Sequence, residues 1–254
     1  MTDQSKSWSK AAENYEEDFV DPFEPETDNP LMPWLEGIPD PKAKTIGDLG
    51  CGTGPILSFL AETFGHVYAV DFAPGMLERA RENARGHKNI TFLHQPLTDL
   101  SNLEGELDIA IAVNSLVMPE IPDLERAISQ IFASLHPGGL FGAILPAMDA
   151  IHYYTMLLLD RALEKGLPIK MAKQNAAKHA EHELFDFAFG QFQFKGLHQH
   201  FWQPFEIPYR LKRAGFRKIY KSQVRLSWDQ FAHGPELSEH PPSWDWFARA
   251  EKPT

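Results

Sequence analysis

A run of glycines at alternate positions gives the sequence its clearest chemical signal. Gly50, Gly52 and Gly54 follow the apolar, β-prone stretch Thr45–Leu49 and precede residues 56–60, which have the composition of a helix start. Glycine permits positive φ values and lets a ligand approach bare backbone where a Cβ would collide. The N-terminus of the following helix would direct free N–H groups at the same spot. The pattern therefore predicts a ligand-binding turn between a strand and a helix.

The spacing of the glycines and a later acidic residue restrict the class of ligand that this turn could bind. The glycines follow G-x-G-x-G, whereas the pyrophosphate-binding turn of dinucleotide folds has G-x-G-x-x-G, and the turn lacks the Lys-Ser or Lys-Thr pair that holds a nucleoside triphosphate. The next predicted strand ends in Asp71. A carboxylate about 20 residues past the turn can accept hydrogen bonds from the hydroxyl groups of a ribose. We therefore expect a ribose-containing ligand other than NAD or ATP.

Together these residues resemble the class I S-adenosylmethionine-dependent methyltransferases. Residues 48–54, D-L-G-C-G-T-G, are similar to the first motif of that family, and residues 71–77, D-F-A-P-G-M-L, resemble the signature after its second strand. The resemblance covers roughly residues 8–145. It implies an enzyme of Rossmann-like fold with S-adenosylmethionine as cofactor. The amino-acid end of the cofactor would lie beside the glycine turn, with the ribose on Asp71.

The resemblance also implies a set of cofactor-binding residues: Trp8, Tyr15, Asp48, Gly50, Cys51, Gly52, Gly54, Asp71, Phe72, Met76, Leu97, Asp99 and Asn114. Many family members carry an acid after the third strand that receives the adenine amino group, but Pro96 holds that place here. Asp99 is the substitute we expect, and a turn-capping role is its alternative. Asn114 follows the fourth predicted strand, where its amide could orient a ligand or bond its own backbone in a turn.

The N-terminal part of the chain, residues 1–43, is expected to be a helix and a linker. Apolar residues recur at spacings of three and four over residues 7–19, which predicts an amphipathic helix. Trp8 and Tyr15 match the W-x-x-x-A-x-x-Y opening of family members whose helix folds over the cofactor as a lid. A helix packed on the edge of the core is the alternative. Trp34 and Leu35 are expected to anchor a short helix in the linker.

From residue 44 onward, strand and helix patterns alternate, which predicts a doubly wound α/β fold with a mostly parallel seven-stranded sheet. The expected strands are residues 45–49, 67–71, 90–93, 107–113, 140–145, 218–228 and 244–251. The expected helices are residues 55–64, 74–85, 123–135 and 204–216. Asp123 would cap the third of these helices, and the H-P-G-G sequence at 136–139 would break the chain before the fifth strand. Residues 44–146 would form the cofactor-binding core, and residues 204–254 would complete the sheet.

Residues 147–203 are longer than a connection needs and are interpreted as a helical and aromatic insertion after the fifth strand. A first helix is expected to reach about residue 165, and a second to run over residues 169–187. Phenylalanines are dense over residues 185–194. An insertion at the carboxyl ends of parallel strands covers the place where such folds bind ligands. We expect a lid or cap that forms the acceptor pocket, with a dimer interface as the alternative.

Candidate catalytic residues come from the same insertion, where a base could remove a proton from the acceptor. They are His152, Tyr153, His198 and His200. Ordinary solvated histidines are the simplest alternative. His179 and His182, or His198 and His200, could also chelate a divalent metal, but neither pair has the spacing of a recognised zinc signature, and no metal is predicted.

Composition limits the partners. The formal net charge is −11, which argues against a nucleic-acid substrate. The single cysteine, Cys51, fits a reducing compartment, and neither a signal peptide nor a membrane-spanning stretch is evident. We expect a cytoplasmic enzyme, monomeric or homodimeric, that methylates a small-molecule substrate. A protein methyltransferase, a nucleic-acid methyltransferase and a non-catalytic S-adenosylmethionine-binding protein are the alternatives.

Overall fold

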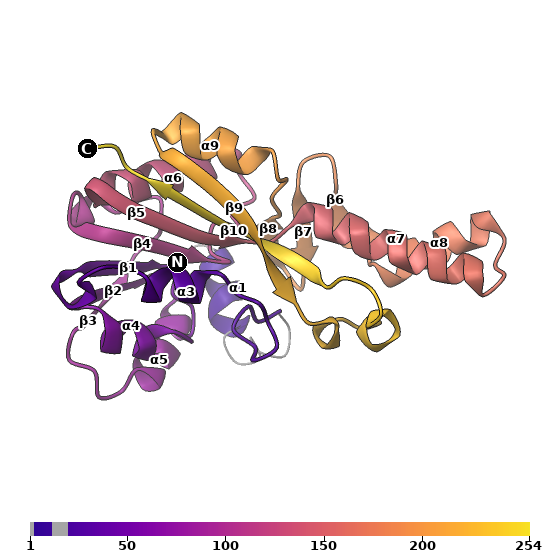
Figure 1. The fold of residues 1–254 in the computed structure, drawn as a ribbon, viewed down its shortest axis with the longest axis horizontal. Helices are drawn as coiled ribbons and strands as arrows, with labels where there is room; N and C mark the ends of the chain where they lie inside the picture. The colour runs from indigo at the N-terminus through magenta and orange to yellow at the C-terminus, as the bar shows by residue number, and fades with distance from the viewer. Residues whose placement is uncertain (1–2, 12–19) are drawn as a thin grey trace.

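The computed structural model describes residues 3–11 and 20–254. Its centre is a seven-stranded sheet in the order β3-β2-β1-β4-β5-β10-β9 (Figure 1). The strands are β1 Thr45–Leu49, β2 His66–Asp71, β3 Ile90–His94, β4 Leu107–Val113, β5 Leu135–Leu145, β9 Arg217–Leu226 and β10 Ser243–Glu251. Strand β10 pairs antiparallel with both β5 and β9 and runs opposite to the other six strands of this sheet, whose remaining pairs are parallel. The prediction of a mostly parallel, doubly wound sheet is confirmed.

Helices cover both faces of the sheet, and the central strand β4 shows why. Ile109 and Ile111 pack into a core with α3 Leu31–Glu36, α4 Leu57–Thr63 and α5 Pro74–Asn83. The alternate residues Ala110 and Ala112 pack into a second core on the opposite face, under α6 Ile121–Ser134 and α9 Glu206–Ala214. A strand buried on both faces reads as a continuous apolar run, which matches the sequence of β4.

Two predicted boundaries around α6 are wrong. The helix begins at Ile121 with Glu120 as its N-cap, so Asp123 lies inside the first turn and caps nothing. Strand β5 begins at Leu135 and runs through the H-P-G-G sequence, which therefore does not break the chain. There Gly138 takes a φ of 79°, and its N–H donates to the carbonyl of Lys252 at 2.9 Å. The pairing with β4 shifts register between Leu135 and Leu140, and the bond to the residue just after β10 holds this irregular stretch in the sheet.

The insertion leaves the sheet at the carboxyl end of β5. It contains α7 Met148–Glu164, α8 Ile169–His179 and a three-stranded antiparallel sheet of β6 Phe185–Asp186, β7 Gln191–Phe194 and β8 Leu197–His200. Helices α7 and α8 lie side by side and project away from the large sheet (Figure 1). The predicted extension of the second helix to residue 187 is wrong, because Glu181 takes a left-handed φ of 51° and starts the short 3₁₀ helix His182–Leu184.

Trp202 closes the base of the insertion, and its side chain is 0% exposed. Its backbone N–H donates to Pro146, its carbonyl accepts from Met148, and its indole Nε1 donates to Leu116 at 2.8 Å. The two ends of the insertion are therefore held together beside β4. This arrangement fixes the insertion at the edge where the carboxyl ends of β1, β4 and β5 meet the amino end of β10.

The remaining elements are short. Helix α1, Asp3–Ala11, contacts both α5 and β8. Four 3₁₀ helices complete the described elements: Pro41–Ala43, Ser101–Leu103, Trp228–Gln230 and Gly234–Leu237. Over residues 3–11 and 20–254, no helix combines the length and the apolar character needed to cross a bilayer.

Candidate functional site

The glycine turn joins β1 to α4, and its three glycines face different surroundings. The N–H groups of Gly50 and Cys51 donate to Val70 at 2.7 and 2.9 Å, which ties the turn to the end of β2. A Cβ at Gly50 would lie 2.3 Å from the Cβ of Ser115, and one at Gly54 would lie 2.6 Å from the side chain of Leu57. These two glycines are required by packing.

Gly52 is different. Its φ is 55°, and a Cβ added there would meet no heavy atom of the described chain within 4 Å. The residue lines a cavity of about 110 Å³. Gly52 therefore presents bare backbone to open space, as a turn built for close ligand approach should.

Asp71 supports this turn from β2. Its Oδ2 accepts from Gly52 N at 3.0 Å, and its Oδ1 accepts from Ala73 N at 2.8 Å. Burial raises the pKa of the carboxyl, although the N–H groups of Ala73 and Gly52 act in the opposite direction. Each oxygen has a further lone pair, so the carboxylate can position the turn and still accept a ligand hydroxyl.

Asp48 lies below the turn, at the end of β1. Burial and, second, the nearby charge of Asp71 raise its pKa to about 7. The carboxyl lines the cavity together with the buried Cys51, whose thiol pKa is raised, first of all by burial. Two buried carboxyls this close favour a cation in the cavity, since a positive charge would offset both the burial and their mutual repulsion.

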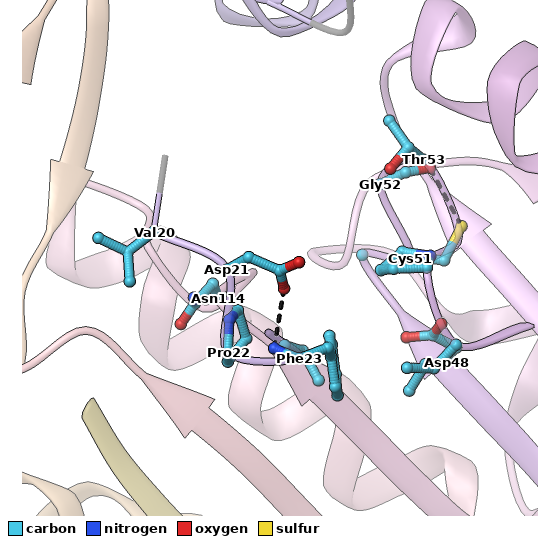
Figure 2. Close-up of a pocket in the computed structure, with 13 residues that line it drawn as sticks. Val20, Asp21, Pro22, Phe23, Asp48, Cys51, Gly52, Thr53 and Asn114 are labelled. Carbon is cyan, nitrogen blue, oxygen red and sulfur yellow. Dashed lines mark hydrogen bonds between the residues drawn. The ribbon is translucent and has the colours of Figure 1, made fainter. Parts of the chain in front are cut away.

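The opposite wall of this cavity comes from the chain before α3. Figure 2 shows Val20 to Phe23 and Asn114 on one side of the space and Asp48 with the glycine turn on the other. Asp21 accepts from Phe23 N at 2.8 Å, which fixes the wall segment in a tight turn. The sequence did not predict residues 20–23 as part of the site, because they carry neither periodicity nor a motif.

A second, larger cavity of about 430 Å³ adjoins the first. It lies between the insertion and the start of β10, and Val20 and Asn114 line both cavities. Most of its wall is apolar or aromatic, formed by Tyr154, Phe185, Phe192, Phe194, Phe201, Phe231 and Trp244 among others. Asp245 of β10 supplies a carboxylate to this wall.

Asn114 stands where the two cavities meet. It takes a left-handed φ of 47°, and its N–H donates to Ile144 at 2.9 Å. Its Oδ1 is buried and has no hydrogen-bond partner among the described residues. A polar atom left unpaired in this way is costly unless a ligand satisfies it.

The other residues assigned to the cofactor lie around Asp71 or in the core. Trp8 of α1 packs against Ala73 and Met76, and Ser5 Oγ donates to the carbonyl of Phe72 at 3.0 Å. Leu97 is 6% exposed and belongs to the core under α6. Tyr15 lies outside the described residues.

Asp99 is on the surface. It accepts from both N and Oγ of Ser101, which lower its pKa, and it lines neither cavity. These contacts match the turn-capping alternative.

The structure does not bring the four candidate catalytic residues together. His152 is exposed and its ring contacts Phe187 in a tilted arrangement, and His198 is exposed on β8. Tyr153 donates to Pro241 at 3.0 Å. None of the four lines either cavity as the described residues form it.

His200, the fourth, is buried at 2% exposure, and its Nε2 lies 3.0 Å from Glu206 Oε2. Glu206 also accepts from Arg210, which in turn bridges to Glu125. Burial opposes ionisation of Glu206, but His200 and Arg210 together hold its pKa below the usual range. This network joins β8 to α9 and fixes the base of the insertion. Among the described residues, no group of three or more His, Cys, Asp or Glu side chains could hold a metal ion.

Comparison with known proteins agrees with this geometry. Residues 46–139 match the family model described as a methyltransferase domain. The trans-aconitate 2-methyltransferase of Variovorax paradoxus is 30% identical over 131 residues, which are 49% of this chain and 47% of that protein. The demethylmenaquinone methyltransferase of Clavibacter sepedonicus is 33% identical over 97 residues, which are 37% of this chain and 38% of that protein. The chain thus spans less than half the length of these curated relatives.

Among solved structures, a chain of the complex between the Haloferax volcanii Trm112 methyltransferase activator and a methyltransferase superposes with a TM-score of 0.66. It is 16% identical, and the match covers 99% of this chain and 97% of that one. Residues 46–139 therefore form a methyltransferase domain, and the chain has the fold of solved S-adenosylmethionine-dependent methyltransferases. The predictions of this family, its fold and its cofactor are confirmed.

Proposed function

We propose that the protein transfers the methyl group of S-adenosylmethionine to a small-molecule acceptor. The observation that carries the proposal is the pair of adjoining cavities that share Val20 and Asn114. One lies on the glycine turn, and the other is larger and mostly apolar. A transferase needs two such sites, because donor and acceptor must meet at one point while each is held separately.

The residues of the smaller cavity fit S-adenosylmethionine. Gly52 leaves open space for the cofactor, and Asp71, which accepts from Gly52 N but lines neither cavity of the described chain, has lone pairs for ribose hydroxyls. The buried Asp48 suits a ligand that carries positive charge on an ammonium and a sulfonium group. When bound, the cofactor supplies a methyl carbon on a positively charged sulfur, which is a ready leaving group.

The protein's own task is therefore mainly positioning. The wall of residues 20–23 and the glycine turn enclose the donor site, while α1 packs over the segment that follows Asp71. The insertion supplies much of the acceptor cavity and would keep water from the reacting atoms. We infer that it acts as the cap expected from the sequence. Holding two reactants in attack geometry can account for about 7–11 kcal/mol of a reaction barrier.

The size of the acceptor cavity favours a small molecule. Its volume of about 430 Å³ lies within the range of about 300–1,000 Å³ typical of small-molecule sites. The two relatives described above are named for methylation of trans-aconitate and demethylmenaquinone, which are small molecules. A protein substrate would call for an open groove, whereas the insertion forms a cavity with aromatic walls.

Calorimetric titration with S-adenosylmethionine and with its demethylated product tests the donor site. We expect one bound ligand per chain and binding at least tenfold weaker in Asp71→Ala. Asp149→Asn is a suitable control, because Asp149 accepts from Trp246 and lines neither cavity. Absence of binding by the folded wild-type protein would refute the proposal. Mass-spectrometric screening of quinols, phenols and carboxylic acids for methylated products then tests the acceptor class.

A further inference from the structure

The acceptor cavity has one carboxylate at the point where it meets the donor site. Asp245 is 7% exposed and lies near the amino end of β10. Its Oδ1 accepts from Ala147 N at 3.2 Å, and Asn114 is a second hydrogen-bond partner of the carboxyl. Because Asn114 lines both cavities, Asp245 stands next to the place where the methyl group would be transferred.

The polar atoms around Asp245 are incompletely satisfied. Asn114 Oδ1 and Trp244 Nε1 are buried without a hydrogen-bond partner in the described chain, and both residues line the acceptor cavity with Asp245. Buried polar atoms are nearly always paired, so unpaired ones on a cavity wall indicate a ligand that supplies the missing partners. The indole can only donate and the amide oxygen can only accept. Successive side chains of a strand point to opposite faces, so the Trp244 indole lies on the other face of β10 from Asp245. The unpaired atom beside the carboxylate is therefore Asn114 Oδ1, and a ligand group there must offer a donor, as a hydroxyl or an amine does.

We infer that Asp245 is the general base of the reaction and accepts the proton of an O–H or N–H nucleophile carried on an apolar, mostly aromatic body. This inference rests on the proposed function. In the step, the acceptor's O–H or N–H bond breaks and the proton goes to a carboxylate oxygen of Asp245. A lone pair of the acceptor atom forms the bond to the methyl carbon. The electron pair of the sulfur–methyl bond stays on sulfur, which becomes a neutral thioether.

The charge state of Asp245 suits this role. Burial raises its pKa to about 7, although the hydrogen bonds from Ala147 and Asn114 oppose the shift. A base is most effective when its pKa lies near the working pH. The other titratable groups on the cavity wall are Tyr154, Lys178, His179, Glu181 and His233. None of the causes of the pKa shift at Asp245 is an ionised group of the described residues, so Asp245 is expected to titrate independently of the other groups on the wall.

Paired probes test the inference without the natural acceptor. 4-Phenylphenol has an aromatic body and one hydroxyl, and 4-methoxybiphenyl is the same body without the donor. Binding of each to the protein loaded with S-adenosylhomocysteine is measured by calorimetry from pH 5.5 to 8.5. In the wild type we expect the phenol to bind about tenfold or more tightly than the ether at pH 8, the fold-change typical of a hydrogen bond to a charged group. The preference should fall as pH drops through about 7.

The variant Asp245→Asn keeps an oxygen for Ala147 N but cannot ionise. It should bind S-adenosylhomocysteine normally and show a phenol preference that no longer changes with pH, while the control Asp149→Asn behaves like the wild type. For any substrate found to be methylated, Asp245→Asn should lower kcat by about 10²–10⁴ with little change in KM.

Three results would overturn the inference: equal binding of the two probes by the wild type, no binding of either, or an unchanged pH dependence in Asp245→Asn. Failure of S-adenosylhomocysteine to bind the wild type would instead refute the proposed function, so the two failures are distinguishable.

Discussion

The bare backbone at Gly52 makes the most specific prediction about the donor site. Gly52→Ala adds one methyl group where the described chain leaves open space, at a φ of 55°. Gly105 is a matched control, because its φ is 66° and an added Cβ there also meets nothing within 4 Å of the described residues. It lies just before β4, at the amino end of that strand, whereas Gly52 follows the carboxyl end of β1.

The two substitutions should cost similar stability and differ in binding. A Cβ in the left-handed region costs about 1–2 kcal/mol, and for a chain of this length each kcal/mol lowers Tm by about 2–4 °C. Both variants should therefore melt roughly 2–8 °C below the wild type. Only Gly52→Ala places a methyl group in the path of the cofactor. Overpacking by one methyl group costs about 1–3 kcal/mol, a roughly five- to 150-fold loss of affinity.

Differential scanning fluorimetry and calorimetric titration with S-adenosylhomocysteine measure the two effects separately. Gly105→Ala should bind as the wild type does. If Gly52→Ala binds the ligand within twofold of Gly105→Ala, then no ligand lies against this turn, and the role assigned to Gly52 is wrong.

Three further predictions concern stability. Burial raises the folded-state pKa of Asp48 to about 7, so its contribution to stability is present below the unfolded-state pKa of about 3.9 and is lost as pH rises through about 7. The urea unfolding midpoint of the wild type should therefore decrease between pH 5 and 8, and Asp48→Asn should make this decrease smaller. Trp202→Ala should destabilise the fold by about 3–5 kcal/mol in urea unfolding, since it empties a fully buried site and orphans the carbonyl of Leu116. His200→Gln should lower stability by about 1–3 kcal/mol in the same assay, because Glu206 loses a buried partner, yet leave S-adenosylhomocysteine binding unchanged.

The sequence predicted the core of the fold well because local and global signals agree there. Strands β1 and β4 lie at the predicted residues, and β4 carries the nearly continuous apolar run that a strand covered on both faces requires. The helix predicted over residues 204–216 ends at Gly215, whose left-handed conformation is the one glycine favours after a helix C-terminus. The boundaries that failed depend on long-range pairing. The start of β5 depends on the pairing of Leu135 with Leu107 and of Gly138 with Lys252, which the local sequence around Gly138 does not reveal.

The candidate site was predicted less completely, for a physical reason. The donor half rests on a motif in which spacing and chemistry coincide, so Gly52 and Asp71 could be named in advance. The acceptor half is assembled from segments far apart in the chain. Asp245 belongs to a strand whose alternation suggests only packing, and residues 20–23 lie in a linker without a pattern. The one available signal was an acidic residue between two tryptophans, on the same strand face as the buried Phe247.

The histidines of the insertion illustrate the opposite error. Their number in one segment suggested chemistry, but burial and pairing decide what each can do. His200 is held by Glu206 at the base of the insertion, whereas His152 and His198 face outward. The enrichment alone therefore carried little information about catalysis.

A crystal structure of the protein with S-adenosylhomocysteine bound would test the two-site arrangement directly. We expect the ligand against Gly52, its ribose hydroxyls on Asp71, and its sulfur facing the acceptor cavity beside Asn114 and Asp245. A ligand bound elsewhere, or one whose sulfur faces away from that cavity, would contradict the proposed methyl transfer between the two sites.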